Sequence, residues 1–143
     1  MNSGKRIYVF SLSKKDIFGY GVDPVNWLRN KDEKPYYFRN KKPKLLPSGS
    51  IVLFSFQGRI FGQATVKEDV KELSLKERRQ ARERDGFEYK YSMILNGSSI
   101  DIFPEPYPKK KDVAPKIGKK FGRVFTILDS EQYHKILEMA RVN

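Results

Sequence analysis

The stretch "GSIVLFSFQGRIFGQATV", residues 49–66, decides the fold. Two runs of branched and aromatic residues, "SIVLFSF" and "RIFGQATV", flank Gln57-Gly58. This pattern predicts two antiparallel strands around a tight turn in which Gly58 takes a positive φ. Gly62 interrupts the second run, which predicts a bulge or the close approach of another backbone segment. The chain therefore contains a β-hairpin, and the other segments are interpreted around it.

Before the hairpin, the segment "RIYVFSLS", residues 6–13, predicts a strand with two apolar faces. Ile7 and Val9 point to one side of it, and Tyr8 and Phe10 point to the other. A strand that is apolar on both faces must be covered on both, so we expect it near the centre of a sheet.

After the hairpin, "FEYKYSMILNG" (87–97) and "RVFTIL" (123–128) predict two further strands. "YYFRN" (36–40) predicts a short extended piece. The pair Asn96-Gly97 is the strongest short hairpin signal, so we expect it to lead into a strand within "SSIDIFPEP" (98–106).

Helix signals occur at three places. Asp23-Pro24 predicts an N-cap followed by proline at the first position of a short helix. Ser74 and Glu77 form a capping-box pattern before a helix over 75–85 with a thin apolar face. A closing helix begins at 129–130, where Asp or Ser can cap it, and shows apolar residues at helical spacing.

This order of elements predicts an α+β fold, a small curved barrel of five or six mostly antiparallel strands with two or three peripheral helices. We expect one domain over residues 1–143, with a loop rich in proline and lysine at 107–122. The polar ending "RVN" suits a junction to another module, so this domain could be the N-terminal part of a longer protein.

Composition argues against an enzyme and against a membrane protein. The chain has no cysteine, so disulfides, zinc fingers and cysteine catalysis are excluded. The single histidine, His134, lies on the closing helix, and no nucleotide-binding or hydrolase motif occurs. Apolar runs are far shorter than the roughly 20 residues that span a bilayer, and no signal peptide is evident. We expect a cytoplasmic, non-catalytic domain without metal or cofactor.

The net charge of the chain indicates the class of its binding partner. The net charge is +12, from 29 Lys and Arg against 17 Asp and Glu. A basic domain binds polyanions because contact with phosphates releases counterions, which favours nucleic acid. The alternative is the lysine-rich proteome of a thermophile, in which the charge is incidental. On the helix over 75–85, Arg79 and Glu83 are spaced as an i,i+4 pair, so an ion-paired surface is the simpler interpretation there.

Aromatic residues stand beside basic residues in three segments, the pattern that stacks bases and holds phosphates. Core packing is the alternative for each aromatic residue, including Phe103 and Tyr107 beside the lysine loop. The candidate base-stacking residues are Phe18, Tyr20, Trp27, Tyr36 and Tyr37. The candidate phosphate-binding residues are Arg39, Lys41, Lys42, Lys44, Lys109, Lys110, Lys111, Lys119 and Lys120.

The hairpin at 49–66 resembles the strand pair of the PUA-like superfamily, in particular its EVE and YTH branches. There, a glycine-led strand and a tight turn precede a strand with a small residue before "A-x-V". The resemblance implies a pocket between the sheet and the loop after the first strand, with an aromatic cage for a modified base. Trp27 would be one wall, and Phe18, Tyr20 and one of Tyr36 or Tyr37 would accompany it.

The resemblance also implies a partner and a setting. Relatives of these branches occur as N-terminal specificity modules of modification-dependent restriction systems, including archaeal McrB-type GTPases. A downstream motor domain in the same chain and a separate nuclease would then be partners. Three hypotheses stay open: a module that reads DNA, with or without methylation; an RNA-binding module of the same fold; and a thermophile protein-interaction domain.

Overall fold

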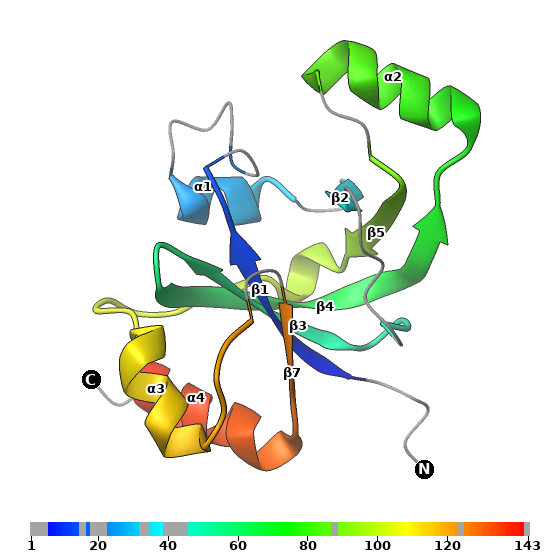
Figure 1. Ribbon diagram of the computed structural model, residues 1–143. Coiled ribbons are helices and arrows are strands. Elements are labelled where there is room, and N and C mark those ends of the chain that lie inside the picture. Colours follow the sequence, from blue (N-terminus) through cyan, green and yellow to red (C-terminus); the bar gives the residue numbers. More distant parts are fainter. Residues whose placement is uncertain are drawn as a thin grey trace.

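The computed structural model in Figure 1 describes residues 6–14, 17, 23–31, 35–38, 46–86, 89–122 and 125–141, and of 35–38 and Asp85 the backbone alone. The strands are β1 (Ile7–Leu12), β2 (Pro35–Phe38), β3 (Ile51–Phe56), β4 (Arg59–Glu72), β5 (Tyr91–Leu95), β6 (Asp101–Ile102) and β7 (Phe125–Leu128). The helices are α1 (Pro24–Arg29), α2 (Leu75–Asp85), α3 (Lys110–Ile117) and α4 (Ser130–Arg141), with a 3-10 turn η1 (Gly97–Ser99).

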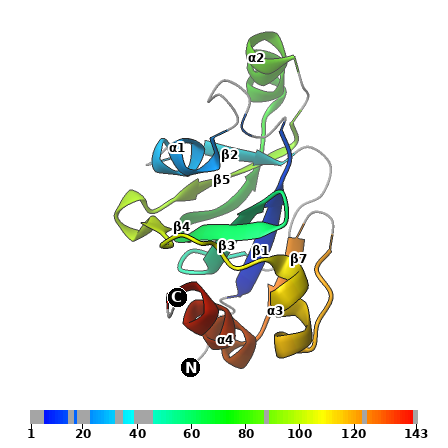
Figure 2. The same cartoon turned by 90° about the vertical axis from the view of Figure 1, so that its left-hand side faces the viewer.

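The strands form one twisted sheet in the order β2-β5-β4-β3-β1-β7, and β6 adds to β4. All pairs are antiparallel except β1 with β3. The predicted α+β class with mostly antiparallel strands is confirmed. Among the described strands no pair joins β2 to β7, so the predicted small curved barrel is a curved sheet that stays open (Figure 2).

The central hairpin forms as predicted. Gln57 and Gly58 both have positive φ, 50° and 77°, as a two-residue turn between twisted strands requires. The β3–β4 register skips Phe61, which is the predicted bulge. A Cβ on Gly62 would lie 3.0 Å from the Asp101 carbonyl oxygen and 3.0 Å from Leu28 Cδ2. Glycine therefore lets β6 and α1 approach the strand closely.

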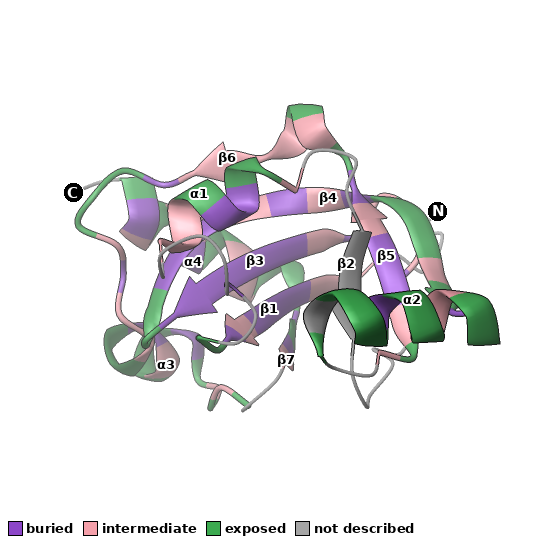
Figure 3. Ribbon diagram, turned by 90° about the horizontal axis from the view of Figure 1, so that it is seen from above, coloured by how far each residue is buried: buried purple, intermediate pink, exposed green. Residues whose placement is uncertain are grey.

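Strand β1 lies inside the sheet, as its two apolar faces predict. Tyr8 and Phe10 belong to one core, which also contains Trp27 and Phe54. Val9 belongs to a second core on the opposite face, closed by α3 and α4. Figure 3 shows the buried residues running along β1 and β3 through the middle of the sheet.

Two expectations are wrong. The loop expected over 107–122 contains α3, whose buried Val113 and Ile117 anchor it to the sheet despite the interior Pro115. Asn96-Gly97 does not form a hairpin. The Asn96 side chain instead accepts a hydrogen bond from the Ser98 amide and caps the 3-10 turn η1. The segment after this turn, β6, pairs with β4 and not with β5.

The predicted helix caps are confirmed. Asp23 Oδ1 accepts from the Val25 amide at 3.0 Å and starts α1. The capping box of Ser74 and Glu77 starts α2. Asp129 Oδ1 accepts from the Gln132 amide at 2.7 Å and starts α4. Across the described residues, no helix is both long and apolar enough to cross a membrane.

Candidate nucleic-acid interface

The predicted aromatic pocket falls largely outside the described residues. Phe18 and Tyr20 lie outside them, as do four of the predicted phosphate-binding residues: Arg39, Lys41, Lys42 and Lys44. Tyr36 and Tyr37 lie on β2, whose backbone pairs with β5 at the end of the sheet. The stacking roles of these residues therefore stay predictions.

The Trp27 side chain extends from α1 into the core. It is 1% exposed, and its ring meets that of Phe54 edge-on with centroids 5.5 Å apart. The Lys31 ammonium lies 5.2 Å from the Trp27 ring centroid. A residue that stacks on a base must present a ring face to it, and in this arrangement Trp27 presents none. The geometry is that of the core alternative, and the cage role stays untested.

The lysines between 107 and 122, where the sequence predicts a loop, fall into two groups: some point inward and others are exposed. Lys110 points inward: its Nζ donates to Ser11 Oγ and lies 5.4 Å from the Phe121 ring centroid. Burial lowers the pKa of Lys110 below its ordinary value. Lys119 Nζ donates to the Ile127 carbonyl. Lys111 and Lys120 are exposed, so they and the partly buried Lys109 are the better placed for phosphates.

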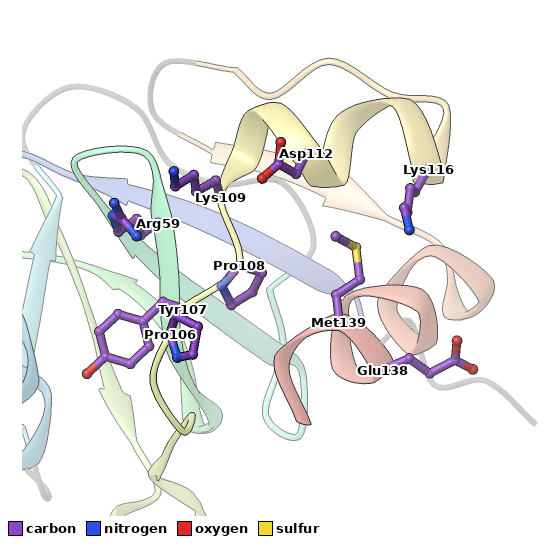
Figure 4. A pocket seen from close by; sticks show the side chains of 9 residues that line it. All are labelled: Arg59, Pro106, Tyr107, Pro108, Lys109, Asp112, Lys116, Glu138 and Met139. Atoms are coloured by element: carbon purple, nitrogen blue, oxygen red, sulfur yellow. The ribbon is translucent and has the colours of Figure 1, made fainter. Parts of the chain in front are cut away.

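An open hollow of ≈ 790 Å³ lies beside this group, between the start of β4, the chain before α3, and helices α3 and α4 (Figure 4). Arg59 and Lys109 lie on one side of it, and Lys116 and Met139 lie on the other. The residues that line it are Arg59, Pro106, Tyr107, Pro108, Lys109, Asp112, Lys116, Glu138 and Met139.

Arg59 and Lys109 are paired across an antiparallel β-bridge. The bridge is fixed by the Ile60 amide, which donates to the Pro108 carbonyl at 3.0 Å, and by the Lys110 amide, which donates to Gly58 at 2.8 Å. Residues opposite each other in such a pair have Cβ atoms about 5 Å apart on the same face, and like charges there are destabilising. Neither side chain forms an ion pair with any described residue.

Tyr107 supplies an aromatic ring at the edge of the hollow. Its ring meets Phe61 edge-on, with centroids 6.4 Å apart, and its hydroxyl donates to Glu105 Oε1 at 3.4 Å. Burial raises the pKa of Tyr107, so it stays a neutral donor at physiological pH. Phe103, its companion in the sequence pattern, is a core residue. The hollow thus joins one partly exposed ring to several cations, with Asp112 as an acidic neighbour.

The sequence pattern missed Arg59 and Lys116. Arg59 follows the hairpin turn, and only the bridge to a segment far along the chain makes it part of the basic group. Lys116 stands in the expected loop, and its place on α3 turns it to the hollow. Across the described residues, no three His, Cys, Asp or Glu side chains gather as a metal site would require, and His134 is exposed.

No family model and no curated protein matches the chain. Among solved structures, it is similar to the N-terminal domain of Thermococcus gammatolerans McrB bound to m5C DNA, with 12% identity and a TM-score of 0.55 over 94% of this chain and 96% of that one. It also matches the YTH domain of Zygosaccharomyces rouxii MRB1 in complex with N6-methyladenosine RNA, with 14% identity and a TM-score of 0.46 over 96% and 87%. The chain therefore shares its fold with the McrB N-terminal domain.

Proposed function

We propose that this chain is a non-catalytic domain that binds nucleic acid, and DNA in particular. The observation that carries the proposal is the bridge between Arg59 and Lys109, which holds two cations side by side, and neither forms an ion pair with a residue in the described ranges. An anion between them would remove the repulsion, and a backbone phosphate has the charge and the acceptor oxygens to do so.

The surroundings of this pair extend the positive surface. Over residues 107–120 the chain has six lysines and one aspartate. Lys111, Lys116 and Lys120 form no ion pair with any residue in the described ranges. Phosphates follow one another along a nucleic-acid strand, so a row of separate cations suits a polymer better than a single small anion.

The finer parts of the proposal come from the shared fold. The McrB N-terminal domain was solved on m5C DNA, and we extend to this chain a preference for a modified base in DNA. The base would leave the duplex and enter a pocket at the β2 end of the sheet, where Tyr36 and Tyr37 lie. The chain would then be the specificity module of a modification-dependent restriction system, with a motor domain and a nuclease as partners.

Fluorescence anisotropy with labelled duplexes tests the binding. Arg59→Glu and Lys109→Glu should each weaken binding about tenfold. Each should also make the slope of log K against log salt less steep by roughly one unit, the contribution of one phosphate contact. Lys67→Glu, on the exposed part of β4 away from α3, makes the same charge change and should have a smaller effect. Absence of binding to any nucleic acid near about 50 mM salt would refute the proposal.

Competition separates the finer alternatives. Duplexes with and without one 5-methylcytosine measure the preference for a modified base. Structured RNA of equal length measures the RNA alternative, because a module that reads A-form shape should prefer it. A stronger affinity for RNA than for either duplex would replace DNA as the ligand and leave the basic surface in place.

A further inference from the structure

Helix α2 stands away from the body of the domain on an extension of the sheet (Figure 1). Strand β4 is 14 residues long, whereas its partner β3 has six and reaches only to Thr65. Beyond this point β4 pairs with β5, and Lys67, Glu68 and Asp69 are exposed. The helix therefore sits at the end of a three-stranded extension, formed by β4, β5 and β2, and not on the main core.

Among the described residues, the contacts of α2 gather at its first turn and at Ala81. Leu73 and Ala81 are its buried apolar anchors. The capping box at Ser74 and an ion pair of 3.3 Å between Lys71 and Glu77 secure the first turn. Hydrogen bonding by the Ser74 backbone amide and hydroxyl lowers the pKa of Glu77, so the cap is ionised at neutral pH. The helix is thus positioned by its caps, and most of its surface faces solvent.

The outer side of α2 combines a large apolar side chain with arginines. Leu75 is 79% exposed. Arg79 and Arg82 follow at i+4 and i+7, which places all three on one stripe of the helix. The expected ion pair between Arg79 and Glu83 is not formed in the described structure, although Arg78 does pair with Glu72 at 3.2 Å. Leu75, Arg79 and Arg82 are all exposed, so this stripe of the helix faces solvent.

The register of the sheet places this stripe at the same end as the expected base pocket. Glu72 of β4 is opposite Tyr91 of β5, and Tyr91 is opposite Phe38 of β2. These residues form one row across three neighbouring strands, with about 5 Å between strands. Leu75 follows Glu72 by three residues, so α2 begins at the same end of the sheet as Phe38 of β2, with β5 between the two strands. Arg59 and α3 lie at the other end of β4.

We propose that α2 is a wedge that enters the duplex at the site where a base is extruded, with Leu75 filling the gap in the stack. This inference rests on the proposed function. Removing a base from the stack costs free energy, and proteins offset that cost by inserting an apolar side chain between the base steps. Arg79 and Arg82 would hold the phosphates on either side of the gap.

A duplex with 2-aminopurine at the target position reports unstacking as a rise in fluorescence. The native protein and Leu75→Met should give this rise, because methionine keeps an apolar side chain of similar reach. Leu75→Ala should reduce the rise severalfold while changing affinity for the duplex less than about tenfold. On a duplex in which the target faces an abasic site, Leu75→Ala should match the native protein, because the stack is already open.

The outcomes separate the wedge from the proposed function. No binding by the native protein would refute the proposed function. Binding without a fluorescence rise, or an equal rise with Leu75→Ala, would refute the wedge and leave the binding surface intact. A change of oligomeric state in Leu75→Ala, measured by sedimentation, would identify α2 as a contact between copies of the chain and would also refute the wedge. Because Leu75 is exposed, the variant should unfold at the same temperature as the native protein.

Discussion

Arg59 and Lys109 are opposite each other in a β-bridge that ties the tip of the central hairpin to the start of α3. The bridge is made by the backbone, so the two side chains are brought together whatever their charge. We therefore expect the free protein to be less stable than it would be with a neutral pair at these two positions. The same two charges should strengthen the binding of an anion.

Replacing Arg59 by Gln should stabilise the free protein by about 0.2–1 kcal/mol at low salt, because it removes a like-charge pair. The gain should shrink as salt rises, since exposed charges are then screened. Urea unfolding at two salt concentrations measures both effects. A loss of stability that is the same at both concentrations would show that Arg59 contributes through packing and not through charge.

Trp27 provides a second prediction, on stability. Trp27→Ala should lower the free energy of unfolding by about 3–5 kcal/mol, because a fully buried ring is removed. Trp27→Phe should retain most of the stability and most of the affinity for nucleic acid. Unfolding curves and binding titrations of the two variants distinguish the roles: a folded Trp27→Phe protein that loses selectivity for a modified base would restore Trp27 as a cage wall.

Gly62→Ala should destabilise the domain by about 1–3 kcal/mol, an overpacking effect. The added Cβ would meet the Asp101 carbonyl oxygen and Leu28 Cδ2, each at 3.0 Å, and the carbonyl belongs to the backbone of β6. Thermal unfolding measures the loss. Amide exchange should also increase in β6 and α1, which both rest on Gly62, and unchanged exchange there would contradict this account.

Lys110 predicts a pH dependence. Burial lowers its pKa in the folded state, so between that value and its ordinary pKa of 10.5 the unfolded chain holds more protons than the folded one. Stability should therefore rise with pH through this window. Lys110→Met should flatten the rise, and the difference between the two proteins removes the contribution of the tyrosines. Urea unfolding from neutral pH to about 10 tests this, and an identical slope in both proteins would rule Lys110 out as the cause.

Much of the framework could be predicted because local chemistry decides it. The turn at Gln57-Gly58 needs residues that accept positive φ. The two-faced pattern of β1 requires cover on both sides, and the two cores supply it. Helix caps at Asp23 and Ser74 depend on side chains one turn away from their partners. None of these features needs information from a distant part of the chain.

The features that could not be predicted depend on distant contacts. The lysine run with Pro115 has a local preference for a loop, and α3 forms because Val113 and Ile117 find an apolar surface on the sheet. Asn96-Gly97 locally favours a hairpin, but the segment after it pairs with β4 instead, where Gly62 allows the backbone of β6 to approach closely. The pairing of Arg59 with Lys109 likewise exists only once the chain before α3 has reached the hairpin.

Strand β4 also sets a spacing. It begins at Arg59, beside α3, and ends at Glu72, three residues before Leu75. At about 3.3 Å per residue β4 spans at most about 45 Å. One turn of B-form DNA is about 34–36 Å long, so the strand is longer than one turn. A straight duplex that met both ends would therefore present them with helix phases that differ by roughly a quarter to a third of a turn. Lengthening or shortening β4 would change that phase, so we expect the length of this strand to affect the affinity for a duplex that meets both ends.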